Sequence, residues 1–200
     1  LVGRGGVPAR ITNWAFKQLC ARVGAPAGYL ETLPATLAAQ NVNHGLAQRL
    51  VDAGADATVS LLFHLNGSLL LRCLTSDKYS RIWNWEVTSR LLDMAARGWV
   101  PATPDIRQYM SAPDQQTALY VSDHDMFAFL RSPNNTVHEH VTDSPTYRGL
   151  IVWNSEVGAS QIGMARFLYR EMCGNHIIWG ASDVATVELR HVGNVRDRWM

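Results

Sequence analysis

The sequence has few cysteines, no long apolar run and no excess of charge of either sign. Its 200 residues include three cysteines, Cys20, Cys73 and Cys173, whose number and spacing fit neither a disulfide framework nor a zinc ribbon. No apolar stretch approaches the ~18 residues of a membrane-spanning helix, and no charged-then-apolar leader opens the chain. We therefore expect a reduced, cytoplasmic protein that does not enter a membrane.

The charge is nearly balanced, with 18 basic against 17 acidic residues and a formal net charge of +1. Because this balance gives no strong global field, any binding to nucleic acid must come from a local patch. Sixteen of the basic residues are arginine, whose planar guanidinium group pairs with phosphate and stacks on bases. GC-rich codon usage explains the same bias, so the arginine content alone indicates no function.

Helical spacing of apolar residues dominates the N-terminal part of the chain. Thr12 is a start signal and Gly24 a stop signal for a first predicted helix. A second short helix is expected over residues 27–33, and a third runs from 34 to 54. Residues 1–56 are therefore predicted to form a helical cap.

A β-hairpin is the clearest local prediction. The pair Asn66-Gly67 separates the apolar runs 59–65 and 68–74, and a two-residue Asn-Gly turn between apolar runs is a strong hairpin signal. Such a turn places Leu62 opposite Leu71. Both faces of the hairpin are largely apolar, so we expect it to be covered on both sides.

A third strand over residues 79–83 and a helix from Asn84 to Gly98 complete a first strand-strand-strand-helix unit, residues 57–100. Beyond a proline-rich connector, residues 114–193 suggest the same order again. Here we expect a hairpin over 118–130, a strand over 149–153, a candidate helix over 161–173, for which a strand is the alternative, and a last half-buried strand over 185–191.

The predicted fold class is therefore α+β. We expect a single domain, residues 1–200, in which the helical cap packs on antiparallel sheet built of strand-strand-strand-helix units, possibly duplicated.

Aromatic and basic side chains alternate between residues 72 and 83. Stacking of a base on an aromatic ring contributes about 1–3 kcal/mol, and arginine and lysine can follow the phosphates. Packing of the tryptophans in a core, with a solvated rim of charge, is the competing interpretation. The candidate nucleic-acid-binding residues are Arg72, Lys78, Tyr79, Arg81, Trp83, Arg148, Arg166 and Arg170.

A metal site is the second candidate. His138-Glu139-His140 would place two imidazoles on one face of a strand, and Asp123 and Asp125 resemble the paired acids of two-metal nucleases. Aspartates in a turn that bond their own backbone explain the second pattern equally simply. We expect no cofactor and assign no catalytic residue, and the sequence favours a protein without enzymatic activity.

Three blocks, residues 12–34, 74–87 and 149–175, resemble in the same order the phage/plasmid-like proteins grouped as domain-of-unknown-function family 932. The clearest part is Asn154-Ser155-Glu156-Val157-Gly158 followed by Cys173-Gly174-Asn175, and His176 departs from the family's pattern. The resemblance implies a gene of phages, plasmids or integrated elements and no established activity. Asn154, Ser155 and Glu156 follow an apolar strand, so they are a candidate functional loop, with helix capping as the alternative.

The predicted unit order is similar to that of phage single-strand annealing proteins of the Red-beta and Erf type. The prediction is therefore a protein of a mobile element that binds single-stranded DNA in replication, recombination or annealing. A homo-oligomer is compatible with this prediction. One alternative is a metal-dependent enzyme acting on nucleic acid or nucleotides through Asp123, Asp125, His138 and His140. Another is a structural or inhibitory factor that binds a protein.

Overall fold

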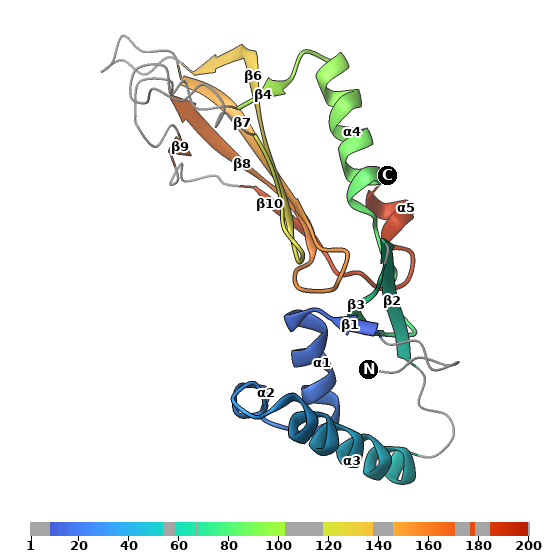
Figure 1. Ribbon diagram of the computed structural model, residues 1–200. Coiled ribbons are helices and arrows are strands. Elements are labelled where there is room, and N and C mark those ends of the chain that lie inside the picture. The colour runs from blue at the N-terminus through green and yellow to red at the C-terminus, as the bar shows by residue number, and fades with distance from the viewer. Residues whose placement is uncertain are drawn as a thin grey trace. The chain divides into compact units, whose positions relative to one another are not determined.

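The structure is a computed structural model and describes residues 9–53, 59–66, 68–102, 118–137, 146–170, 177–178 and 185–199. The chain forms two compact units, Leu1–Tyr79 and Ser80–Met200, and the boundary falls inside the predicted first strand-strand-strand-helix unit. Both units combine helices with antiparallel strands (Figure 1). The predicted α+β class is therefore confirmed.

The first unit is a three-stranded sheet with three helices. Strand β3 (Ser68–Ser76) lies between β1 (Ala9–Ile11), which is parallel to it, and β2 (Val59–Asn66), which is antiparallel. The hairpin and the three helices, α1 (Asn13–Val23), α2 (Ala27–Leu30) and α3 (Ala35–Ala53), confirm the prediction. The Thr12 hydroxyl accepts a hydrogen bond from Ala15 N at 3.1 Å, and Gly24 ends α1 with a φ of 70°.

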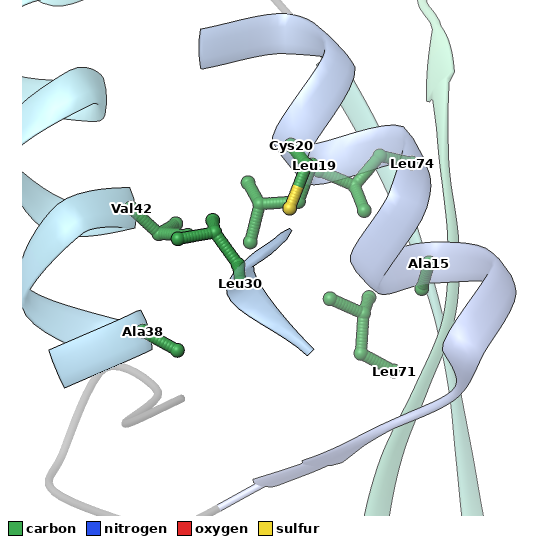
Figure 2. Packing of buried hydrophobic residues seen from close by; sticks show 8 residues of the cluster. All are labelled: Ala15, Leu19, Cys20, Leu30, Ala38, Val42, Leu71 and Leu74. Carbon is green, nitrogen blue, oxygen red and sulfur yellow. The ribbon is translucent and has the colours of Figure 1, made fainter. Parts of the chain in front are cut away.

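The core of this unit lies between the helices and β3. Figure 2 shows side chains from all three helices pointing toward Leu71 and Leu74 of β3. The Gln18 side chain also accepts a hydrogen bond from Leu74 N at 2.8 Å, so α1 is attached to the strand by a polar contact as well as by packing.

The predicted register of the hairpin is wrong. Leu62 lies opposite Cys73, and Arg72 is the extra residue of a β-bulge. Because a bulge shifts the alternation of a strand by one residue, Leu71 and Leu74 both join the core. Leu61 and Phe63 stay exposed, so the hairpin is not covered on both sides.

The second unit is built on an antiparallel sheet in the order β10-β8-β7-β6-β4, with β5 paired to β6 and β9 paired to β8. Figure 1 shows its helices on one side of these strands. The elements are α4 (Asn84–Ala96), β4 (Val100–Pro101), β5 (Leu119–Val121), β6 (Met126–Val137), β7 (Thr146–Asn154), β8 (Ile162–Arg170), β9 (Ile177–Ile178), β10 (Thr186–Leu189) and α5 (Val195–Trp199).

One face of this sheet packs against the two helices. Val87 of α4 and Val195 of α5 lie in one buried cluster with Leu150, Val152 and Ile162 of the sheet. The helix predicted from Asn84 is thus confirmed, and its apolar stripe holds it on the strands.

The other face carries a second apolar cluster made of strand residues and Ala102. Phe167 lies opposite Gly149 and Trp153 lies opposite Gly163. A Cβ atom at Gly149 would lie 2.3 Å from the ring of Phe167, and one at Gly163 would lie 2.4 Å from that of Trp153. Each ring therefore occupies the space that a side chain would take at the glycine opposite.

The candidate helix over residues 161–173 is wrong, because residues 162–170 form β8. Strand periodicity is hidden in the sequence because both faces of this strand are apolar and buried, with Ile162 toward the helices and Phe167 toward the other face. The described part of residues 114–193 consequently does not repeat the strand-strand-strand-helix order. The predicted strand over 79–83 is also wrong, since Tyr79 makes only an isolated bridge and residues 81–83 precede α4 without pairing.

Among the described residues, none of the helices combines the length and the apolar character needed to cross a bilayer.

We expect Gly149→Ala to destabilise the second unit by about 1–3 kcal/mol, because the new methyl group would force the buried Phe167 ring to move. Urea denaturation followed by circular dichroism measures the change. Gly28→Ala is the control, since open space surrounds Gly28 in α2 and alanine favours a helix by up to about 1 kcal/mol. Equal stability of Gly149→Ala and the wild type would contradict the packing described here.

We also expect the second unit to lose stability in mild acid. Burial lowers the pKa of His191, which is 4% exposed, and the Ser80 carbonyl oxygen lies 3.3 Å from its Nδ1. The folded state therefore favours neutral His191, so its contribution is complete above the unfolded pKa of about 6.5 and is lost as pH falls below it. The free energy of unfolding should fall by up to about 1.4 kcal/mol per pH unit there, and His191→Gln should flatten this part of the profile.

Candidate nucleic-acid interface

The first turn of α4 is fixed to the end of β7 by side-chain hydrogen bonds. Glu156 Oε1 accepts from Asn84 N at 2.8 Å, and Asn154 Nδ2 donates to Asn84 Oδ1 at 2.8 Å and to the Ile82 carbonyl at 3.0 Å. Glu86 Oε2 accepts from Trp83 N at 2.9 Å. Two carboxylates thus satisfy backbone N–H groups at the positive end of the helix dipole.

The same Glu86 side chain fixes α5 to α4. Its Oε1 accepts from Arg196 Nε at 2.8 Å and from Nη2 of the same guanidinium group. The Glu86 side chain is only 10% exposed, and a charge-assisted pair of this kind is stronger and more directional than a neutral hydrogen bond. Figure 1 shows the result, with α5 beside the first turns of α4.

A pocket of about 220 Å³ lies where the two helices meet. Ile82, which is 1% exposed, contributes a buried apolar side chain, whereas the Trp85 side chain is 65% exposed. Both helices line the pocket, through Ile82, Trp85, Glu86, Ser89, Arg90, Arg196 and Trp199. We call this group of residues the α4–α5 pocket.

The polar groups of the α4–α5 pocket are mainly hydrogen-bond donors. Arg90 makes a 3.4 Å ion pair with Asp93 in which both side chains are about half exposed, so solvent screens it and it contributes little. Arg196 uses two of its five N–H groups on Glu86. Trp199 Nε1 is buried and has no acceptor among the described residues.

The structure brings two of the predicted site residues to this helix end. The Arg81 guanidinium carbon lies 5.3 Å from the ring centroid of Trp83, a cation–π contact, and Arg81 Nε donates to the Glu156 carbonyl at 2.7 Å. Both residues immediately precede α4, next to the pocket residue Trp85.

The other predicted binding residues lie elsewhere. Arg72, Lys78 and Tyr79 belong to the first unit. Arg148 and Arg166 are exposed and share the helix-facing side of the sheet with Leu150, but Arg148 is six residues along β7 from Asn154, or about 20 Å. Arg170 ends β8, and its side chain lies outside the described part of the chain.

The side chains of the predicted functional loop are hydrogen-bonded to neighbouring segments of the fold. Asn154 and Ser155 are fully buried. Ser155 Oγ donates to the His124 carbonyl at 2.6 Å and accepts from Ala159 N at 2.9 Å. Glu156 caps α4, as described above, and not a helix after the loop, because residues 162–170 form β8.

The alternative metal site is only partly described. His138 and His140 lie outside the described residues. Asp125 lies in the turn between β5 and β6, where its Oδ1 accepts from Ser160 Oγ at 2.9 Å and its N–H donates to Ser122 Oγ at 3.0 Å. Within the ranges that the structure describes, no three His, Cys, Asp or Glu side chains are grouped to hold a metal ion.

Sequence reasoning missed Arg90, Arg196 and Trp199. No local pattern connects Arg90 with the five-residue helix α5, which lies about a hundred positions later in the chain. The one available signal was the spacing of Trp85 and Ser89, which places both on one side of α4.

A second aromatic surface lies on the sheet face away from α4 and α5. It includes Tyr120 and Phe127, which are 48% and 38% exposed, and the half-buried Trp153. Among the described residues of this face, Arg131 places its guanidinium carbon 4.9 Å from the ring centroid of Tyr147. Glu188, which pairs with Gly163, lies on the same face.

We expect Glu156→Ala to lower the stability of the second unit by about 0.5–2 kcal/mol, the usual effect of losing a helix N-cap. Thermal unfolding followed by far-ultraviolet circular dichroism measures the change. Glu188→Ala is the matched control, because Glu188 is an exposed acid on β10. Unchanged stability of Glu156→Ala would contradict the capping role and favour the functional one.

Comparisons with protein-family models, with curated proteins and with solved structures find no match to this chain. The resemblance to family 932 therefore stays a prediction.

Proposed function

We propose that the protein binds single-stranded DNA at the α4–α5 surface. The observation that carries this proposal is the α4–α5 pocket, which combines two indole rings with two guanidinium groups in a space of about 220 Å³. A concave site with an apolar wall and a few convergent polar groups is the usual form of a ligand site.

The chemistry of the pocket residues suits a nucleotide strand. The exposed Trp85 ring offers a face on which a base can stack, and such stacking contributes about 1–3 kcal/mol per base. Arg90 is half exposed on the same helix, within reach of solvent and of a phosphate. Arg81 precedes α4 and the exposed Arg198 lies on α5, so each adds a guanidinium group to the segments that form the pocket.

The size of the pocket favours a single strand over a duplex. It is smaller than the ~300–1,000 Å³ of typical small-molecule sites, so one ring at a time can enter. Bases in a duplex are stacked and paired, and extracting one costs a few kcal/mol, whereas a single strand presents its bases freely.

The biological setting of this proposal comes from the resemblance to phage/plasmid-like proteins. A single-strand binder of a mobile element would act in replication, recombination or annealing, inside the cell. The binding surface proposed here does not depend on that setting, because it rests on side chains of the second unit alone.

We expect Trp85→Ala to weaken binding of a single-stranded oligonucleotide by about 1–3 kcal/mol, because the stacking face is removed. Fluorescence anisotropy at low salt measures the affinity. Leu92→Ala is the matched control, since Leu92 is 71% exposed on the same helix and does not line the pocket.

Arg90→Gln tests the phosphate contact in the same assay, with Arg97→Gln, at the C-cap of α4, as its control. It should reduce the slope of log affinity against log salt concentration by about 1. The proposal fails if the wild-type protein binds no oligonucleotide even at low salt, or if Trp85→Ala and Leu92→Ala bind equally well.

A further inference from the structure

Two arginines lie exposed on the helix-facing side of the sheet, outside the α4–α5 pocket. Arg148 belongs to β7 and Arg166 to the neighbouring β8. Arg148 pairs with Leu168 and Arg166 pairs with Leu150, so the two arginines are diagonal neighbours on one face. Diagonal neighbours on paired strands lie ~7–8 Å apart, within reach of one another for long side chains. We call these two residues the Arg148–Arg166 pair.

The charge on this side of the sheet has one sign among the described residues. The described strands of the second unit contain a single acidic residue, Glu188, and it lies on the opposite face, through its pairing with Gly163. Asp93 of α4 forms an ion pair with Arg90. Two exposed guanidinium groups that share a face without a carboxylate repel each other, and an anion placed between them relieves the repulsion.

The Arg148–Arg166 pair lies at a defined distance from the start of α4. Arg148 is six residues along β7 from Asn154, and Leu150, the partner of Arg166, is four residues from it. These separations correspond to about 20 and 13 Å. Asn154 is bonded to Asn84, the first residue of the helix that carries the pocket. A nucleotide adds ~3.4 Å to a strand even when its base is stacked, so about six nucleotides cover this distance.

We propose that the Arg148–Arg166 pair binds phosphates of the same DNA strand whose base occupies the α4–α5 pocket. The proposal rests on the single-stranded DNA binding proposed above and extends its surface along the sheet to about six nucleotides. The side chains opposite the two arginines are leucines, which have no polar group with which to read a base edge. These contacts therefore position the strand and do not depend on its sequence.

The length of the strand provides the first test, with the unaltered protein. A trinucleotide can place a base in the pocket but is too short to reach Arg148, whereas a dodecamer spans both sites. Fluorescence anisotropy at several salt concentrations measures the affinity of each. A phosphate contact with a single strand contributes about −0.7 to the slope of log affinity against log salt concentration, so the dodecamer slope should be steeper by at least about 1.4.

The double variant Arg148→Gln/Arg166→Gln provides the second test. On the dodecamer it should reduce the slope by about 1.4 and weaken binding about tenfold at low salt, because two phosphate contacts are lost. On the trinucleotide it should leave the affinity unchanged. The double variant Arg148→Lys/Arg166→Lys keeps both charges, so it should keep the wild-type slope.

The matched control is Arg10→Gln/Arg131→Gln, which removes the same amount of charge. Arg10 is exposed on β1 of the first unit, and Arg131 pairs with Gly149 on the opposite face of the sheet. This variant should keep the wild-type slope on the dodecamer. An equal loss in both glutamine variants would mean that net charge alone acts, and it would overturn the proposal.

The outcomes also separate this proposal from the one on which it rests. If neither oligonucleotide binds the wild-type protein, single-stranded DNA binding fails and the extended surface falls with it. If the dodecamer binds, Trp85→Ala weakens it and Arg148→Gln/Arg166→Gln does not, the pocket binds DNA and the extended surface is overturned. Equal weakening of the trinucleotide and the dodecamer by Arg148→Gln/Arg166→Gln also overturns it, because a distant phosphate contact cannot act on the shorter strand.

Discussion

The arrangement of the second unit depends on a group of side-chain hydrogen bonds at the start of α4. Glu156 and Asn154, at the end of β7, bind the first turn of the helix, and Glu86 from that turn binds α5. Each contact joins segments about seventy or more residues apart in the chain. Apolar packing alone would let α4 slide along the sheet, because it is non-directional, whereas these hydrogen bonds fix the helix axially. The position of Trp85 and the shape of the α4–α5 pocket follow from them.

The sheet supports this arrangement because each of its faces carries an apolar cluster. Leu150 and Val152 face the helices, and Phe167 faces the other way across Gly149. Packing a ring over a glycine on the neighbouring strand fills the gap left by the missing side chain and holds the strands in register. The helices therefore rest on a rigid surface, and a site built on rigid elements keeps its geometry better than one built on loops.

Local signals were sufficient for the elements whose ends are set by local chemistry. Thr12 and Gly24 mark α1 because capping and a positive φ are properties of single residues. The sequence of β8 does not show the alternation that identifies a strand, because buried apolar residues lie on both of its faces. The pocket could not be foreseen, because Arg196 and Trp199 reach Trp85 only through the tertiary structure. A sequence pattern indicates which secondary structure a segment prefers, whereas the pocket depends on which segments come into contact in the folded chain.

The balanced charge of the chain is a poor guide to the charge at its surface, and the α4–α5 region shows why. Two of its acidic groups are directed inward, because Glu86 and Glu156 accept hydrogen bonds from backbone N–H groups of the α4 start and Glu86 also binds Arg196. Asp93 on α4 and Asp197 on α5 are exposed. Arg90 is half exposed and has only a long, solvent-screened partner. Glu86 and Glu156 thus stabilise the fold, whereas Arg90 keeps its guanidinium group at the surface on the same helix as the exposed Trp85 ring, so the net charge of the chain does not predict which charges its surface presents.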